Sequence, residues 1–447
     1  MRHSLSVLLL GLTLLVAATQ LAAQPLLLIS IDGLRPADVI DAQQRGLQLP
    51  NLQAFLTRGA YASDVRGVLP TLTYPSHTTL ITGVAPSVHG IASNFTFDPT
   101  QINQQGWYWY ASDIRVPTLW DAAHAAGLST ANVHWPVSVG ANIDNNLPQI
   151  WRTGSPDDRK LLTALATPGL LPALEKELGP YADGIAEDLP GDANRTRFAV
   201  KLLETRQPYF MTAYLTALDT EQHASGPDTP AARKTLEGID ALIGELVASA
   251  QRVHPDGVVA IVSDHGFAPV QQDVNLYQPF IQAGLITVQH GKVTDWQAMP
   301  WNDGGSAAIV LHDPSNATVK AKVADLLKQV QADPRYAIAQ VLDHDQLVAR
   351  GGTAQASWFV LFKLGSEMAG APAAPLDAPS HLHGMHGYDA TLPEMRSTFL
   401  IAGKGVPAGK RLGSIDMRDI APTLAGLMGV SLPQAQGRAL LPAVAGH

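Results

Sequence analysis

The sequence contains no cysteine, although it has 447 residues. This absence excludes structural disulfides, cysteine-ligated zinc, iron–sulfur clusters and cysteine nucleophiles. Charge is also sparse: charged residues make up 15% of the chain, and 39 acidic residues outnumber 30 basic ones. Proteins that bind nucleic acid electrostatically usually carry a basic excess, so no stable nucleic-acid complex is expected. Hydrophobic residues nevertheless make up 46%, enough for a large core, which excludes general disorder.

Long apolar runs are scarce as well. The one that stands out covers residues 5–18, and it is shorter than the roughly 20 residues that a membrane-spanning helix needs. It follows the basic Arg2 and ends in small residues around Ala23. This pattern predicts a secretory signal over residues 1–23 that is cleaved. We therefore expect an exported protein, periplasmic or secreted, with no membrane span after cleavage.

What the chain does have is an alternation of buried strands and amphipathic helices. Continuous apolar runs at residues 26–31, 210–215 and 257–263 are typical of buried parallel strands. Helical spacing of apolar residues lies between them, at residues 117–126 and 231–252. The pattern predicts an α/β fold with a doubly wound, mostly parallel sheet and helices on both faces. Ligands of such sheets bind beyond the carboxyl ends of the strands.

Residues 272–385 show a different pattern of predicted strands, helices and loops. Strands are expected at residues 307–311 and 358–362 with a helix at 319–331 between them, and the Ala-, Pro- and Gly-rich residues 365–379 are expected to form a loop. This segment is predicted to be a smaller inserted α+β cap. The catalytic core would then comprise residues 24–271 and 386–447.

Carboxylates and imidazoles gather near the predicted strand ends. The six candidates are Asp32, Asp219, His223, Asp264, His265 and His386. Asp219 and His223 would share one face of a helix, because they are four residues apart. A single Asp at such a position often only caps a helix, but three carboxylates and three imidazoles together suit two divalent ions. This donor set favours zinc.

A hydroxyl group stands near a predicted helix start. Thr73 precedes Tyr74 and Pro75, and residues 77–82 are compatible with a helix. A metal-activated hydroxyl can act as a nucleophile, and a helix N-terminus favours an anion. The alternative for Thr73 is ordinary helix capping.

These segments resemble the nucleotide pyrophosphatase/phosphodiesterase family (type I phosphodiesterases) of the alkaline phosphatase superfamily. The similar stretches are residues 31–35 (IDGLR), 73–77 (TYPSH), 82–91, 219–227 with Asp219 and His223, 263–266 (SDHG) and 386–389 (HGYD). They occur in family order from residue 26 to about 405, which is nearly the whole chain after the signal. The resemblance implies an alkaline-phosphatase-like fold and two zinc ions as cofactors.

The resemblance also implies roles for single residues. Asp219, His223 and His386 would hold one zinc ion, and Asp32, Asp264 and His265 would hold the other. Thr73 would be the nucleophile, coordinated to this second ion. Asn94 and the backbone N–H of Tyr74 would donate to a phosphate oxygen. The aromatic rings of Tyr74 and Tyr214 would lie near the leaving group or the nucleotide base, with plain core packing as their alternative role.

The expected function is that of an exported two-zinc phosphoric ester hydrolase, with a phosphothreonine intermediate on Thr73. Its substrate would be a small phosphate ester or nucleotide. Ala217-Leu218 and Gln222 depart from the residues that the family commonly has around its first ligand pair, which puts nucleotide specificity in question. An alkaline phosphomonoesterase or phosphonate hydrolase of the same superfamily stays open, as does a non-catalytic zinc-binding surface protein. A sulfatase is disfavoured because the chain has no cysteine to convert to formylglycine.

Overall fold

The computed structural model describes residues 23–102, 106–182, 184–368, 371–372 and 374–442. The predicted signal segment, residues 1–23, lies outside these residues except for its last position. Among the helices described, none is both long enough and apolar enough to cross a membrane.

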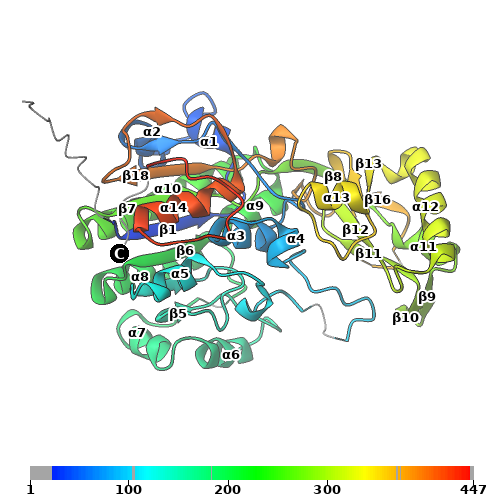
Figure 1. The fold of residues 1–447 in the computed structure, drawn as a ribbon, viewed down its shortest axis with the longest axis horizontal. Coiled ribbons are helices and arrows are strands. Elements are labelled where there is room, and N and C mark those ends of the chain that lie inside the picture. Colours follow the sequence, from blue (N-terminus) through cyan, green and yellow to red (C-terminus); the bar gives the residue numbers. More distant parts are fainter. Residues whose placement is uncertain (1–22, 103–105, 183, 369–370, 373, 443–447) are drawn as a thin grey trace, which may run out of the picture.

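The centre of the molecule is an eight-stranded sheet with the strand order β19-β2-β18-β7-β1-β6-β4-β5 (Figure 1). Its strands are β1 (Leu26–Ile31), β2 (Ala60–Tyr61), β4 (Thr130–Val133), β5 (Asn145–Leu147), β6 (Phe210–Leu215), β7 (Val258–Val262), β18 (Phe399–Gly403) and β19 (Lys410–Arg411). The central strand β1 runs parallel to both neighbours, β6 and β7, whereas β18 runs antiparallel to β7 and β2. The predicted mostly parallel α/β sheet is therefore confirmed, and so are its three predicted strands.

Helices cover both faces of this sheet, because successive side chains of a strand point to opposite sides. Leu27 and Ile29 of β1 enter one apolar core, and Leu26 and Leu28 enter another. The first core is closed by α1 (Pro36–Ile40), α2 (Pro50–Arg58), α6 (Asp157–Leu165), α7 (Leu170–Leu178), α8 (Leu189–Arg206), α9 (Ala217–Ser225) and α10 (Pro230–Val253). The second is closed by α3 (Thr73–Thr82), α5 (Leu119–Ala125) and α14 (Ile420–Met428). The short helix α4 (Pro86–His89) follows α3.

A smaller α+β region lies at one end of the molecule, beside the core (Figure 1). It contains the antiparallel sheet β11-β12-β14-β13, a two-stranded pair β9-β10, and three helices. Their bounds are β9 (Ile286–Gln289), β10 (Lys292–Trp296), β11 (Ala298–Asn302), β12 (Ser306–Leu311), β13 (Ile338–Asp343), β14 (Trp358–Phe362), α11 (Tyr277–Gln282), α12 (Ala317–Ala332) and α13 (His344–Ala349). The strands and the helix that the sequence predicts in this region are all present.

One expectation for this region is wrong in part. Residues 365–379 do not form only a loop: β15 (Gly365–Met368) and β16 (Asp377–Pro379) pair with opposite sides of β8 (Ala268–Val274). Strands this short are stabilised by a partner distant in sequence, so local composition conceals them. Because β8 runs across residue 272, the division into core and cap at that point stays a prediction.

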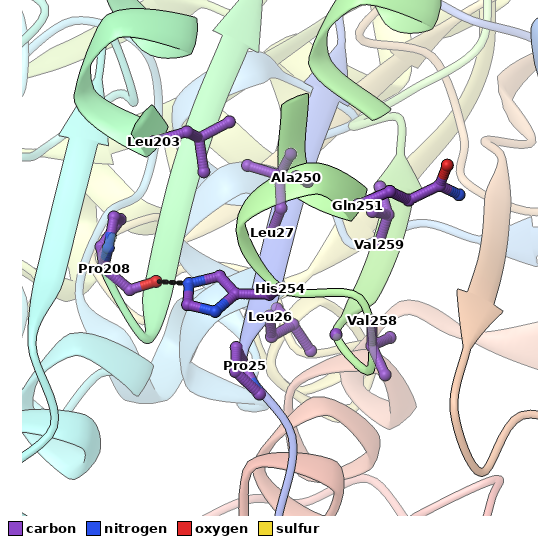
Figure 2. A pocket seen from close by; sticks show the side chains of 11 residues that line it. Pro25, Leu26, Leu27, Leu203, Pro208, Ala250, Gln251, His254, Val258 and Val259 are labelled. Carbon is purple, nitrogen blue, oxygen red and sulfur yellow. Dashed lines mark hydrogen bonds between the residues drawn. The ribbon is translucent and has the colours of Figure 1, made fainter. Parts of the chain in front are cut away.

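At the amino-terminal ends of the central strands lies a small, mostly apolar hollow (Figure 2). Pro25, Leu26 and Val258 line it, together with His254 at the end of α10. The ring of His254 donates from Nε2 to the Pro208 carbonyl at 3.1 Å. The imidazole that lines this hollow therefore has a hydrogen-bond partner within the protein.

Candidate active site

The opposite, carboxyl-terminal edge of the sheet holds most of the predicted site residues. Asp32 directly follows β1, and Asp264 and His265 follow β7. Asp219 lies in the first turn of α9, the helix that begins after β6, and His223 lies one turn further along. Parallel neighbouring strands bring these three segments together, because their carboxyl ends meet at one edge.

Thr73 and His386 reach the same edge from outside the central sheet. Thr73 is the first residue of α3, and Leu72 before it is extended, so the hydroxyl stands at the expected helix start. His386 follows the two-residue strand β17 (Gly384–Met385), which pairs with β8. Its ring stacks on that of His265 with centroids 3.6 Å apart. The structure therefore brings all six candidate ligands and Thr73 into one cluster.

One group of possible metal ligands comprises Asp32, Asp264 and His265, which offer ligand atoms within 4.8 Å of one another. His265 Nε2 lies 3.3 Å from Asp32 Oδ1 and 3.1 Å from Asp264 Oδ2. Thr73 Oγ1 lies 3.4 Å from the same nitrogen. These are the three residues expected around the ion nearest the nucleophile.

A second group comprises Asp219, His265 and His386. His386 Nε2 lies 3.7 Å from Asp219 Oδ1. The expected third member, His223, approaches the other carboxylate oxygen of Asp219, with Nε2 3.5 Å from Oδ2. His223 thus adjoins this group through Asp219, while His265 lies between the two groups.

The carboxylates of this cluster suit cations. Asp32 Oδ1, Asp219 Oδ1 and Asp264 Oδ2 are buried and have no hydrogen-bond partner within the described part of the chain. Burial, reinforced by the neighbouring carboxylates, raises the pKa of Asp32 and of Asp219 well above the ordinary value. Buried carboxylates without partners are costly. Three of them at one place therefore fit divalent ions.

The three histidines are oriented in a way that also suits metal binding. Each ring places Nδ1 next to a backbone carbonyl: His223 to Gly384 at 2.9 Å, His265 to Gly266 at 3.1 Å and His386 to Thr71 at 2.9 Å. A carbonyl can only accept, so Nδ1 carries the proton and Nε2 presents its lone pair to the carboxylates. Burial lowers the pKa of His265 and His386 well below the ordinary value, and that of His223 to about 4. Neutral imidazoles of this kind are metal ligands.

The backbone N–H of Tyr74 has a different partner from the one expected. It donates to Asn94 Oδ1 at 2.9 Å, and its expected donation to a phosphate oxygen stays a prediction. The same bond leaves Asn94 Nδ2 as the amide donor of that side chain, and Asn94 lines the cleft. The Tyr74 hydroxyl donates to Gln149 Oε1 at 2.8 Å, with the ring buried.

The Tyr214 hydroxyl donates to Asp32 Oδ2. The register of β1 and β6 explains this contact: Tyr214 pairs with Ser30, and Asp32, two residues further on, points to the same face. Tyr214 is buried and lines the cleft. Its hydroxyl therefore orients a candidate metal ligand, a contact that neither of the roles considered for this ring includes.

The segment that carries Asp219 is braced by a buried ion pair. The N–H groups of Thr216 and Ala217 donate to the Asp192 carboxylate of α8 at 3.0 and 2.9 Å. Arg195 Nη1 lies 3.2 Å from the same carboxylate, and both side chains are buried. Helix starts leave N–H groups without intrahelical partners, so Asp192 serves α9 as a cap supplied by another helix. Sequence reasoning missed this pair.

Sequence reasoning also missed part of the cleft wall. The cleft encloses about 940 Å³ counted out to open solvent, and five further polar or aromatic residues line it: Trp107, Gln149, Trp151, Glu187 and Thr220. The rings of Trp107 and Trp151 lie 5.1 Å apart between centroids. The aromatic stretch at residues 107–110 is dense for a chain with 6% aromatic residues, and that signal could have pointed to the cleft. Glu187 lies in none of the sequence motifs, so no such signal points to it.

The fold and this cluster define an α/β protein with a metal-ligand cluster at the carboxyl edge of its sheet, and two solved structures share the fold. Human ectonucleotide pyrophosphatase/phosphodiesterase 5 has the same fold, with a TM-score of 0.65 and 18% identity over 93% of this chain and 97% of that chain. The murine protein, solved as an inactive variant in complex with AMP, gives a TM-score of 0.66 with 17% identity over the same shares of the two chains.

The particular family follows from the sequence model for type I phosphodiesterase / nucleotide pyrophosphatase, which matches residues 26–389; the chain belongs to this family. A relative in Schizosaccharomyces pombe, an uncharacterized pyrophosphatase/phosphodiesterase, is 27% identical over 57% of this chain and 47% of its own length. Mouse family member 3 is 27% identical over 54% of this chain and 25% of its own length. The chain thus spans half or less of these two relatives. Bovine bis(5′-adenosyl)-triphosphatase ENPP4 is 25% identical over 91% of this chain and 78% of its own length.

Proposed function

We propose that this protein hydrolyses phosphodiester or phosphoanhydride bonds of nucleotide-like substrates, with a two-zinc centre and Thr73 as the nucleophile. The observation that carries the proposal is a cluster beside Thr73, at the start of α3. It contains three neutral imidazoles and three buried carboxylate oxygens that have no hydrogen-bond partner among the described residues. The relatives support the substrate class, since one is named a bis(5′-adenosyl)-triphosphatase and another was solved with AMP.

The zinc assignment follows from the donor set. Asp32, Asp264 and His265 would hold one ion, and Asp219, His223 and His386 would hold the other. Mixed carboxylate and neutral imidazole donors suit zinc, and no cysteine is available to favour a softer metal. When bound, two such ions would supply Lewis acidity and lower the pKa of a coordinated hydroxyl or water.

The reaction at Thr73 has two displacements at phosphorus. In the first, Thr73 Oγ1 attacks, its bond to phosphorus forms, and the bond from phosphorus to the leaving oxygen breaks; the hydroxyl proton is lost and the alcohol or nucleotide leaves. In the second, a water oxygen attacks the phosphothreonine, the Thr73 oxygen–phosphorus bond breaks, and Thr73 regains a proton. Two inversions give net retention at phosphorus.

Neutral groups of the chain would hold the phosphoryl oxygens. The Asn94 amide nitrogen, fixed by the bond from the Tyr74 N–H to Asn94 Oδ1, would donate to one of them. The N-terminus of α3, at Thr73, would add a favourable helix dipole for the same anion. The Asn94 side chain is held in place before substrate arrives, so little reorganisation would accompany the developing charge.

A substrate panel on zinc-loaded protein tests the proposal. We expect bis(p-nitrophenyl) phosphate and dinucleoside polyphosphates to be hydrolysed with a higher kcat/KM than p-nitrophenyl phosphate or a phosphonate. Preference for the monoester would instead support the phosphomonoesterase alternative, and preference for the carbon–phosphorus bond would support the phosphonate hydrolase. No zinc-dependent turnover of any of them would favour the non-catalytic zinc-binding protein.

The proposed enzyme works outside the cytoplasm. The support is the sequence of residues 1–23, with a basic start, an apolar run and small residues at its end. Mass spectrometry of the mature N-terminus tests this, and an intact Met1 on the accumulated protein would contradict it.

A further inference from the structure

The smaller α+β region reaches the candidate active site at one tight turn. Residues 303–305 (DGG) form this turn, between the end of β11 and the start of β12. Asp303 is 2% exposed, and the fully buried Ser93 donates from Oγ to its Oδ1 at 2.6 Å. Asp303 belongs to neither group of possible metal ligands and does not line the cleft. The proposed reaction therefore leaves this buried pair without a task.

The turn is packed tightly against the segment that carries His386. The N–H of Gly305 donates to the His386 carbonyl at 2.9 Å. Gly387, at φ +86°, lies so close that a Cβ there would be 2.0 Å from the carbonyl oxygen of Asp303. The His386 ring and the Gly387 N–H in turn donate to the Thr71 carbonyl, at 2.9 and 3.1 Å, on the segment that leads into α3. These contacts fix the turn relative to a candidate metal ligand and to the start of α3.

The buried pair bears on Asn94 because Ser93 is its neighbour in the chain. Two other contacts hold Asn94: its Oδ1 accepts from the Tyr74 N–H at 2.9 Å, and its carbonyl accepts from the Tyr108 N–H at 3.1 Å. The bond from Ser93 to Asp303 adds a third contact, one residue away, from a different part of the fold. The place of the Asn94 amide nitrogen thus depends on three separate segments of the chain.

The burial of this hydroxyl–carboxyl pair makes its geometry specific. A buried donor or acceptor that loses its partner costs more free energy than the bond itself contributes. Ser93 and Asp303 therefore favour the arrangement in which they meet. A catalytic donor needs such support, because a displacement of about 1 Å can cost about 100-fold in rate.

We propose, on the basis of the proposed hydrolysis at Thr73, that Asp303 is a positioning residue for this reaction. By accepting from Ser93, Asp303 holds the chain at residues 93–94 so that the Asn94 amide nitrogen is aimed at a phosphoryl oxygen. The turn is suited to this role because it is also fastened to the segment of His386. The smaller α+β region thereby sets the distance between the phosphate donor and a candidate metal ligand.

Ser93→Ala is the principal variant, because it removes a single oxygen atom from the pair. At neutral pH, its kcat/KM for bis(p-nitrophenyl) phosphate should fall by about 10-fold, as for a buried acceptor left without its donor. Asp303→Ala should cause a similar loss. Asp303→Asn should retain at least about half of the native value, since its amide oxygen still accepts from Ser93. Zinc content should be the same in all three variants, because no proposed metal ligand is changed.

A double-mutant cycle separates positioning from a merely structural role. Asn94→Ala alone should lower kcat/KM by about 100-fold, as expected for a lost donor to the developing charge. If the pair acts through Asn94, Ser93→Ala should change kcat/KM by less than about 2-fold in the Asn94→Ala background. The same cycle with Asp303→Ala is an independent measurement. A loss of the same size in both backgrounds, no loss in either, or a loss of zinc would overturn the proposal.

Ser414→Ala is the matched control. Ser414 of β20 (Ser414–Asp416) donates to Asp64 Oδ1 of β3 (Asp64–Arg66) at 2.7 Å, and neither residue lines the cleft. This variant also removes a bond from serine to a carboxylate, but it should leave turnover unchanged in both backgrounds.

Failure of the proposed function would look different. In that case the native, zinc-loaded protein hydrolyses no diester at all. Calorimetric binding of AMP to the zinc-loaded variants then decides the role of Asp303 separately. Weaker binding in Ser93→Ala that disappears in the Asn94→Ala background supports the positioning role, and equal binding by native protein and Ser93→Ala contradicts it.

Discussion

The two ends of the central sheet are built from the same strands and differ in how they treat polar groups. At the amino-terminal ends, the hollow of Figure 2 is mostly apolar, and its histidine, His254, has a carbonyl partner. At the carboxyl-terminal ends, three buried carboxylates have oxygens without partners within the described residues. The histidine at the amino edge is satisfied within the protein, whereas the carboxyl edge holds acceptor oxygens that a bound cation would stabilise.

This difference follows from the direction of the strands. The segments that follow the parallel strands β1, β6 and β7 carry candidate site residues at the carboxyl edge. Asp32 and Asp264 lie just beyond the buried hydrophobic strands β1 and β7, which fix their positions. The comparison predicts that substitutions at the carboxyl edge change chemistry, while substitutions at the amino edge change stability alone.

The largest effect is expected for Thr73→Ala. Removal of the nucleophile should lower kcat by about 10⁴-fold while leaving zinc content and melting temperature nearly unchanged. Stopped assays measure kcat, metal analysis measures the zinc content, and thermal unfolding gives the melting temperature. Thr82→Ala on the same helix is the matched control, since the Thr82 hydroxyl donates to the Thr78 carbonyl away from the cluster. Near-native turnover in Thr73→Ala would contradict the nucleophile assignment.

A second large effect is expected for Asp264→Asn. The amide oxygen can keep the bonds that Asp264 Oδ1 accepts from the N–H groups of Gly33 and His265, but the negative charge is lost. Zinc affinity should fall by about 100-fold or more, and the stabilisation that zinc gives in thermal unfolding should shrink. Asp256→Asn, at the amino edge and paired with Lys404, is the control. Equal zinc affinity in both variants would contradict the assignment of Asp264 as a zinc ligand.

A moderate effect on stability is expected for Asp303→Asn. Burial raises the pKa of Asp303 to about 8, and Ser93 donates to its carboxyl at 2.6 Å. The folded protein thus keeps this proton up to about pH 8, whereas the unfolded chain loses it near the ordinary pKa of an aspartate, 3.8. The unfolded chain binds fewer protons in that window, so this group makes stability fall as pH rises through it.

Asp303→Asn should abolish this fall of stability with rising pH. At pH 9 the melting temperature of Asp303→Asn should exceed that of the native protein by about 2–5 °C, and at pH 4 the difference should be small or absent. Differential scanning calorimetry across pH measures it. Asp313→Asn, a substitution at the surface, should follow the native curve. Parallel curves for Asp303→Asn and the native protein would show that Asp303 is ionised in the fold.

The smallest effect is expected at the amino edge, for His254→Gln. Loss of the bond to the Pro208 carbonyl should cost about 0.5–1.5 kcal/mol of unfolding free energy, with kcat and KM unchanged. Denaturant titration and steady-state assays measure the two quantities. A change in kcat would contradict the inference that substitutions at the amino edge change stability alone.

Much of the site could be predicted because its chemistry is encoded locally. Asp32 and Asp264 directly follow apolar strands, and Asp219 and His223 are one helical turn apart, so short stretches of sequence suffice to place them. The sheet itself was predictable for the same reason, since β1, β6 and β7 are continuous apolar runs.

What could not be predicted depends on contacts between distant segments. Tyr214 holds Asp32 because of the register between β1 and β6, and no local pattern specifies that register. The Tyr74 N–H is used by Asn94 because the intervening chain folds back on α3. The strands β15 and β16 exist because β8 lies between them. In each case the partner is decided by tertiary structure.

The stacking of His386 on His265 has a consequence for biosynthesis. The chain must complete the region between β8 and β17 before it can present His386, although the other five candidate ligands have been made long before. Domains form as they emerge during translation, and pairings that are distant in sequence come late. A nascent chain that stops short of residue 386 would therefore expose three clustered acids with one imidazole missing. The metal affinity of such a truncated chain is therefore expected to be lower than that of the full chain.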